Sequence, residues 1–304
     1  MRPEVQHTFP EVVMQSFEQR AKELLQSLEG LPTVPDVMLK VNREIGSPSA
    51  TARSLAAIIR NDPSLVAAVL RAANSPIYRG RYAETTSIQN AVARLGFKEV
   101  GRIVTSVSLI RTFEGLGSGI DHKAFWYHSV TTGIATGIFR RYSTRKQEME
   151  TIEAESAFVA GLLHDIGILL MDQYFPEELA LVKSTASKLH IPLAQAERAA
   201  LDTDHGRIGA MLLRRWSIPE EVVSAVAWHH DPDLAPPEHR RIAQIVHLAD
   251  FICVNQAIGD TGEGLYEGFS EGAWHDLGLS VSDVESMLEE VRTEADRSEV
   301  IATV

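Results

Sequence analysis

The spacing of the apolar residues constrains the fold of this chain more than any other feature. Near the start they recur at three- and four-residue steps, as at Phe17, Ala21 and Leu24, which is the period of an amphipathic helix. A clear helix start follows at Asp62 and Pro63, because aspartate accepts hydrogen bonds from the first N–H groups and proline fits the first turn. No pair of alternating apolar runs flanks a tight Asn-Gly or Asp-Gly turn, so no hairpin is expected. The chain is predicted to be all-α.

A glycine-rich stretch divides the predicted helices into two groups. Residues 113–121 read FEGLGSGID, and three glycines with a serine do not fit a helix interior. Asp121 is placed to cap the helix that follows. We therefore expect an N-terminal helical subdomain over residues 1–115 and a C-terminal helical subdomain over residues 116–304. The first is expected to pack on the second.

The composition limits the classes of binding partner and the cellular compartment that we expect for this chain. The 304 residues include 41 acidic and 29 basic side chains, for a formal net charge of −12. This charge disfavours nucleic acid and anionic membrane surfaces as partners. A single cysteine excludes an intramolecular disulfide and favours a reducing, cytoplasmic location. We see no uninterrupted run of about 18 apolar residues, and therefore expect no membrane-spanning segment.

A histidine and an aspartate interrupt the most apolar stretch of the chain. Residues 158–176 read FVAGLLHDIGILLMDQYFP, which places His164 and Asp165 among apolar neighbours. A buried carboxylate is costly unless it is paired, hydrogen-bonded or bound to a metal. Gly161 and Gly167 flank the pair and leave room for neighbouring helices to approach closely.

Further histidines and a second aspartate follow on predicted helices. The full set comprises His128, His164, Asp165, His205, His229, His230 and Asp250. Any one of them alone is more often a hydrogen-bonded core residue, but seven in an ordered series indicate a shared site. Imidazole and carboxylate suit iron, manganese, nickel or zinc, and helices of a bundle can converge such groups. We predict one or two divalent transition metals, with Asp165 as the bridge between two.

The sequence resembles the HDOD family, the HD-related output domains of the HD superfamily of metal-dependent phosphohydrolases. The resemblance rests on the series H…HD…H…HH…D and on residues 31–78, which contain the elements NDPSL and ANSP. The stretch SIQNAVARLGFKEV continues it, and the whole match runs from Leu31 to Asp250. It implies an N-terminal helical bundle packed on a C-terminal HD-like bundle. It also implies a role in bacterial signal transduction.

The metal-ligand positions are similar to those of the HD-GYP phosphodiesterases, which hydrolyse cyclic di-GMP. Carried over by position, one metal would be held by His128, His164, Asp165 and Asp250. The other would be held by Asp165, His205, His229 and His230. Two departures weaken the enzymatic interpretation. Ile168 stands where HD-GYP proteins have the phosphate-binding lysine of HDxGK, and prolines replace the GYP element after His230.

Our leading hypothesis is an HDOD signalling module that acts through protein interaction, with signalling proteins as partners and an intact HD-type metal site. The alternative is a metal-dependent phosphohydrolase acting on a cyclic dinucleotide or another nucleotide phosphate. In that case Asp165 would be essential for catalysis, and Arg207, two residues from His205, would be the best candidate to bind phosphate. A di-iron redox or oxygen sensor is a third possibility.

Overall fold

All regular structure in the described part of the chain is helical, which confirms the all-α prediction. The computed structural model describes residues 16–27, 33–115, 117, 119–255 and 269–302. The first half of the chain forms α1 (Phe17–Ser27), α2 (Asp36–Ile45), α3 (Ala52–Ile59), α4 (Pro63–Asn74), α5 (Pro76–Arg79), α6 (Ile88–Leu95) and α7 (Phe97–Thr112). The second half forms α8 (His122–Tyr142), α9 (Lys146–Glu150), α10 (Ala154–Leu163), α11 (Ile166–Tyr174), α12 (Pro176–Leu189), α13 (Leu193–Leu201), α14 (His205–Arg215), α15 (Glu220–Trp228), α16 (Arg240–Asn255), α17 (Glu271–Asp276) and α18 (Val284–Ala302), with short 3-10 turns at Pro232–Leu234 and Val281–Asp283.

Side-chain caps set several of the helix starts. Asp62 accepts hydrogen bonds from the backbone N–H groups of Ser64 and Leu65, which confirms the predicted start of α4. Asp121 caps α8 in the same way, through the N–H groups of Lys123 and Ala124. Asp62 and Asp121 therefore cap the helices that the sequence predicted they would cap.

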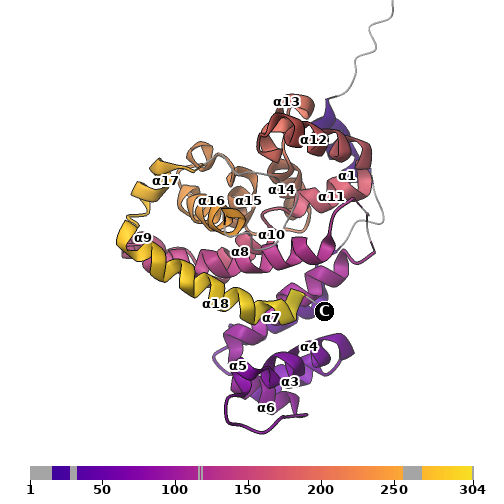
Figure 1. Cartoon of the computed structure of the whole chain (residues 1–304). Coiled ribbons are helices and arrows are strands. Elements are labelled where there is room, and N and C mark those ends of the chain that lie inside the picture. The colour runs from indigo at the N-terminus through magenta and orange to yellow at the C-terminus, as the bar shows by residue number, and fades with distance from the viewer. Residues whose placement is uncertain (1–15, 28–32, 116, 118, 256–268, 303–304) are drawn as a thin grey trace, which may run out of the picture.

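The buried apolar residues form two clusters. The first is built from α2, α3, α4, α6 and the first part of α7, and the second from the helices that follow (Figure 1). Leu109 and Phe113 at the end of α7 already belong to the second cluster, so α7 runs from one into the other. The division at residues 115 and 116 stays a prediction, since Leu116 lies outside the described residues.

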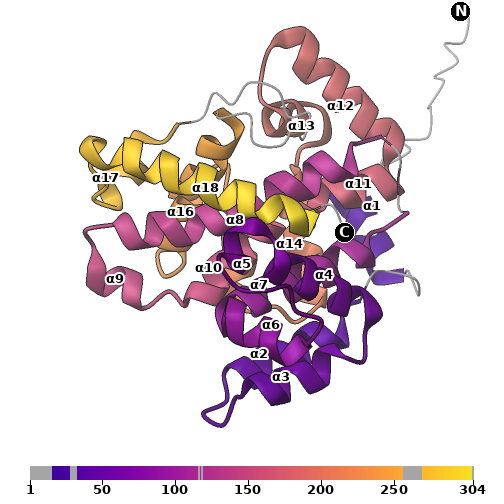
Figure 2. The same ribbon diagram turned by 60° about the horizontal axis from the view of Figure 1, so that its bottom comes forward.

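Two terminal helices pack on the C-terminal cluster. In α1, Phe17 stacks edge-on against Phe175 with ring centroids 4.8 Å apart, although it is far away in sequence. The last helix, α18, lies across α8 and reaches α7 and α4 (Figure 2). Its residues Met287 and Val291 are buried against the second cluster. α18 therefore touches both groups of helices.

One stretch, Ala154–Tyr174, is long and apolar enough by composition to cross a membrane. His164 and Asp165 interrupt this stretch, so it is not the uninterrupted apolar run that was looked for in the sequence. In the structure this stretch forms α10 and α11, and 78% of its apolar 18-residue window is buried inside the protein. A core helix of a soluble protein passes the same test, and the burial is consistent with a soluble protein.

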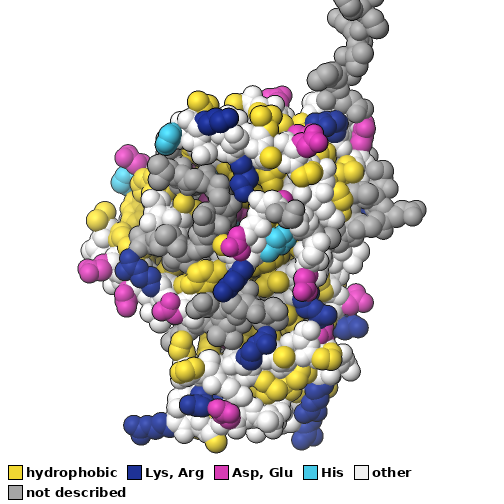
Figure 3. Space-filling view, turned by 45° about the vertical axis from the view of Figure 1, so that its right-hand side comes forward, with side chains coloured by type: hydrophobic (Ala, Val, Ile, Leu, Met, Phe, Trp, Pro, Cys, Tyr) yellow, Lys and Arg dark blue, Asp and Glu magenta, His cyan; other side chains and the backbone are white. Residues whose placement is uncertain are grey.

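Charges of both signs are interspersed over the described surface on the face shown in Figure 3. Acidic and basic side chains alternate there with scattered apolar ones, and no large field of a single sign is visible among the described residues of that face. The net charge of −12 is therefore not concentrated on this side of the molecule.

Candidate metal centre

The structure brings all seven predicted side chains together inside the C-terminal helices. They come from the middle of α8 (His128), the junction of α10 and α11 (His164, Asp165), the start of α14 (His205), the end of α15 (His229, His230) and the interior of α16 (Asp250). Three overlapping groups among them have candidate ligand atoms within 4.8 Å of one another. Their role as metal ligands stays a prediction, but their convergence is a property of the fold.

A break in the helix lets two adjacent residues face one centre. Neighbours on a regular helix point about 100° apart, which would separate His164 from Asp165. Here α10 ends at Leu163, and Asp165 has φ −97° and ψ 9°, outside the helical range, before α11 starts. This interruption of the helix at Asp165 lets both side chains face the centre.

The two glycines that flank the pair allow close helix contacts, as expected. A Cβ atom on Gly161 would lie 2.8 Å from the Cα atom of Gly133 in α8. A Cβ atom on Gly167 would overlap the backbone carbonyl of His205 and lie 2.9 Å from the backbone nitrogen of Gly209 in α14. Only glycine therefore lets α8 and α14 approach the segment that carries His164 and Asp165.

Three side chains, those of His128, His164 and Asp250, gather on one side of Asp165. His128 Nε2 lies 3.1 Å from Asp250 Oδ1 and 3.3 Å from His164 Nε2. His164 Nε2 lies 3.1 Å from Asp165 Oδ2 and 3.5 Å from Asp250 Oδ1. Two imidazoles and two carboxylates thus point at a common space.

The other oxygen of Asp165 faces the remaining three histidines. Its Oδ1 lies 3.2 Å from His205 Nε2 and 3.6 Å from His229 Nε2. His230 Nε2 in turn lies 2.8 Å from His205 Nε2. Oδ2 faces the first group and Oδ1 the second, so Asp165 lies between the two groups. Its role as a bridge between two metals stays a prediction.

Hydrogen bonds on the outer side of the rings fix which nitrogen faces the centre. The Nδ1 atoms of His164 and His229 each lie 2.7 Å from a backbone carbonyl oxygen, that of Gly161 and of Val226. A carbonyl oxygen only accepts, so each Nδ1 carries a hydrogen. In the neutral rings Nε2 therefore presents a lone pair to the carboxylates, an arrangement that a cation between them would stabilise.

The surroundings of the two buried carboxylates also favour a bound cation. Asp165 and Asp250 are fully buried, and neither oxygen of either group has a hydrogen-bond donor with suitable geometry among the described residues. The Nε2 atoms of His164 and His229 lie close by, but in the neutral rings they face the oxygens with lone pairs. An ionised carboxylate in such a position is costly without a counter-charge.

The buried carboxylates and imidazoles shift one another's pKa values. Burial raises the pKa of Asp165, but the nearby His164, His205 and His229 outweigh it and hold this pKa well below its usual value. Burial lowers the pKa of His164, but Asp165 and Asp250 outweigh it and raise this pKa well above its usual value. A divalent metal bound by these side chains would displace protons from the imidazoles.

The donor set fits transition metals. Five imidazoles and two carboxylates, with one carboxylate shared, are the ligands that zinc, iron, manganese and nickel accept. The orphaned carboxylate oxygens and the fixed outer hydrogen bonds support that fit independently of the sequence pattern. The number of metals, one or two, stays a prediction.

Sequence reasoning missed Glu197, which orients one of the histidines. This buried carboxylate in α13 accepts from His205 Nδ1 at 2.8 Å and from the His205 backbone N–H at 2.9 Å. Burial lowers the pKa of His205, but Glu197 and Asp165 outweigh it and raise this pKa well above its usual value. In the sequence Glu197 is visible only as an acidic residue shortly before His205, in the segment that forms α13.

His247 also contributes from outside the centre. Its Nδ1 lies 2.7 Å from the backbone carbonyl oxygen of His229, and its ring is buried. It lies three residues before Asp250 on α16, so it supports the turn after α15 from the helix that carries a predicted ligand.

Arg207 lies at the edge of the site and not within it. It is in the first turn of α14, and its guanidinium carbon lies 5.0 Å from the ring centroid of Trp228. Its Nε atom is 4.0 Å from Asp204 Oδ2, and about a third of its side chain is exposed. Its predicted role in phosphate binding stays a prediction.

Comparison with other proteins identifies the family. The family model of the HDOD domain matches residues 31–232. An uncharacterized protein of Treponema pallidum (strain Nichols) is 26% identical over 231 residues, which cover 76% of this chain. The chain spans only 43% of the length of that relative.

Solved structures share the fold. An HDOD domain protein of unknown function from Geobacter sulfurreducens has a TM-score of 0.73 at 24% identity, with 93% of this chain and 95% of the other covered. A protein of Marinobacter aquaeolei VT8, named provisionally for signal transduction, has the same score and identity, covering 94% and 64%. A protein of Shewanella amazonensis SB2B, named provisionally as a phosphohydrolase, scores 0.68 at 22% identity, covering 93% and 97%. Because the family model spans most of the sequence, the chain belongs to the HDOD domain family.

Proposed function

We propose that the protein is an HDOD signalling module that holds two divalent transition metals in its C-terminal helices and acts by binding other signalling proteins. The proposed metal binding is supported by the arrangement around Asp165, whose two fully buried oxygens face two groups of imidazoles. His128, His164 and Asp250 would complete one metal site with Asp165. His205, His229 and His230 would complete the other.

The burial of the centre favours a structural or sensing role over catalysis. Six of the seven side chains are fully buried, and only His230 is partly accessible. A substrate needs an open coordination position that faces a cavity. Ile168, where HD-GYP proteins have lysine, is itself buried at 1% exposure and supplies no charge. A closed centre of this kind would stabilise the helices that a partner binds.

The proposed setting is the cytoplasm, with a protein as the partner. The single cysteine fits a reducing compartment, and the acidic balance makes nucleic acid and anionic membranes poor partners. A nucleotide remains a possible ligand under the enzymatic alternative below. In that case Arg207, about a third exposed in the first turn of α14, would be the candidate to bind its phosphate.

Elemental analysis of the purified protein tests the proposed metal binding. We expect close to two equivalents of transition metal in protein from metal-replete cells, and a loss of both in Asp165→Ala because that carboxylate is shared. Asp296→Ala, which removes an exposed aspartate of α18, is the matched control and should keep its metal. Well-folded wild-type protein without metal, or metal retained in Asp165→Ala, would contradict the proposal.

The second candidate is a metal-dependent phosphohydrolase, favoured by the complete ligand set. Bound metals lower the pKa of water and neutralise charge that develops on a phosphoryl group. The chain itself would contribute Arg207 as a cation for the substrate. Turnover of cyclic di-GMP or another nucleotide phosphate by metal-loaded protein, abolished in Asp165→Ala, would support the enzyme. Absence of turnover with the metal content verified would leave the signalling module.

A further inference from the structure

Two of the predicted ligands come from segments that are far apart in the sequence. His205 begins α14 and His230 lies just past the end of α15, yet their Nε2 atoms are 2.8 Å apart. Each has an aspartate as its immediate neighbour, since Asp204 precedes His205 and Asp231 follows His230. The positions of these two aspartates therefore bear directly on the positions of the two imidazoles.

One nitrogen atom of Arg198 joins the two aspartates. Arg198 lies in α13, and its Nη1 donates to Asp204 Oδ2 at 3.0 Å and to Asp231 Oδ2 at 2.9 Å. The other oxygen of Asp204 accepts from a backbone N–H in the first turn of α14 and caps that helix. The guanidinium thus connects the residue before His205 with the residue after His230.

The charge of Arg198 also keeps the two carboxylates compatible. Both Oδ2 atoms lie within 3.0 Å of the same nitrogen, so two like charges are held close together. The side chain of Asp204 is only 3% exposed, so solvent ions screen its charge little. Arg207 Nε lies 4.0 Å from Asp204 Oδ2, which is too far for a hydrogen bond. Without Arg198 the carboxylates of Asp204 and Asp231 would repel each other.

The residue next to Arg198 holds the start of α14 at a second point. Glu197 accepts from His205 Nδ1 at 2.8 Å and from the His205 backbone N–H at 2.9 Å, which fixes this histidine relative to α13. Arg198 extends from the same helix to Asp231, beside the other histidine. Both imidazoles are therefore held relative to one helix.

We propose that Arg198 is a positioning residue of the metal centre, which bridges Asp204 and Asp231 and so holds His205 and His230 at the separation that a shared metal requires. The inference rests on the proposed metal binding and adds no ligand to it. A repulsion that moved Asp231 would carry His230 with it, because the two are adjacent in the chain. The two Nε2 atoms would then no longer be directed at one point.

The affinity of the full chain for zinc, measured by competition with a chelator, tests this role. Arg198→Gln should weaken zinc binding by about tenfold or more, the usual effect of removing a group that orients metal ligands. Charge alone predicts the opposite sign, because the loss of a nearby cation favours a divalent metal. Weaker binding therefore reports the positions of the histidines and not the electric field of the arginine.

Two further variants separate this repulsion from a general loss of structure. Arg198→Lys keeps the positive charge and should recover most of the affinity, because both hydrogen bonds of Arg198 come from a single nitrogen. Asp231→Asn, added to Arg198→Gln, removes the repulsion and should also recover affinity, although it takes a negative charge away from the metal. Failure of both variants to recover zinc binding in folded protein would overturn the proposal.

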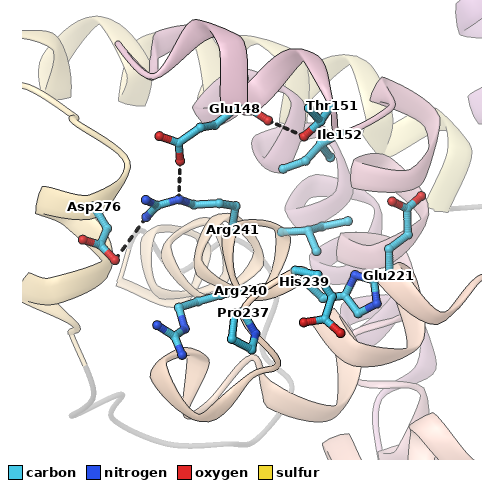
Figure 4. A pocket seen from close by; sticks show the side chains of 11 residues that line it. Glu148, Thr151, Ile152, Glu221, Pro237, His239, Arg240, Arg241 and Asp276 are labelled. Carbon is cyan, nitrogen blue, oxygen red and sulfur yellow. Dashed lines mark hydrogen bonds and ion pairs between the residues drawn. The ribbon is translucent and has the colours of Figure 1, made fainter.

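Arg241 provides the matched control. It likewise joins two carboxylates, with Nε 2.6 Å from Glu148 Oε2 and Nη1 3.1 Å from Asp276 Oδ2 (Figure 4). Its side chain is 30% exposed, against 33% for Arg198, but neither of its carboxylates adjoins a predicted ligand. Arg241→Gln should therefore bind zinc like wild type.

The outcomes distinguish this inference from the proposed metal binding. Wild-type zinc affinity in Arg198→Gln, or an equal loss in Arg241→Gln, would overturn the role of Arg198 and leave the metal centre standing. Wild-type protein that binds no zinc, manganese, iron or nickel would overturn both.

Discussion

Gly167 offers the sharpest test of how the helices assemble the centre. It is the second residue of α11 and faces the start of α14. In Gly167→Ala the new Cβ would overlap the carbonyl oxygen of His205 and lie 2.7 Å from its carbonyl carbon and 2.9 Å from the backbone nitrogen of Gly209. These are backbone atoms, so no side chain can rotate away.

The size of the effect follows from these contacts. Carbon atoms pack at about 3.5–4.0 Å, so the two helices must separate by roughly 1 Å. Overpacking of this kind costs about 1–3 kcal/mol, and the rigid neighbours place Gly167→Ala near the upper end. Replacing a helical glycine by alanine returns up to about 1 kcal/mol. The net loss of about 2 kcal/mol corresponds to a melting temperature lower by roughly 4–8 °C.

The measurement is thermal unfolding followed by circular dichroism, together with metal content. Besides the lower melting temperature, we expect metal to be lost first from the side of His205, because its Nε2 is drawn away from Asp165. The matched control is Gly272→Ala in α17, where the nearest atoms to a new Cβ lie 3.6 Å away and no clash arises. The reasoning is refuted if Gly167→Ala melts at or above the wild-type temperature with its metal retained.

Three further predictions address the surroundings of the centre. Glu197→Gln removes the charge that orients His205, and should weaken metal binding about 10–100-fold in a chelator competition, while unchanged affinity would count against that role. Metal affinity should rise with pH by about tenfold per unit for each proton displaced, because the pKa values of His164 and His205 are raised and the metal must replace those protons; titrations at pH 6, 7 and 8 would show a flat profile if the rings were already free of them. Asp62→Ala should cost about 0.5–2 kcal/mol in denaturant unfolding, because it removes the cap of α4, and no change would show that the cap is dispensable.

The elements with strong local signals were predictable from sequence. Asp62 with Pro63 and Asp121 mark helix starts through their own backbone hydrogen bonds, which depend on residues only two or three positions away. The seven-residue set was also predictable, because imidazoles and carboxylates are conspicuous on apolar helices.

Features that depend on distant contacts were not predictable. Glu197 looks like an ordinary acidic residue of an amphipathic helix, and only the fold places it against His205. The break between Leu163 and Ile166 falls at His164 and Asp165, but apolar residues continue on both sides of it, so their period does not show where α10 ends. The packing of Phe17 on Phe175 likewise joins segments that no short-range pattern connects.

The wide sequence spacing of the candidate ligands has a consequence for folding. The side chains from His128 to Asp250 meet only after α8, the α10–α11 junction, α14, α15 and α16 have all docked, so no shorter fragment of the C-terminal helices contains the complete set. Long-range contacts of this kind form late, after the loops between them have closed. A metal would therefore bind only after these helices have assembled. Its presence would indicate that the protein is folded, and it would not direct the folding.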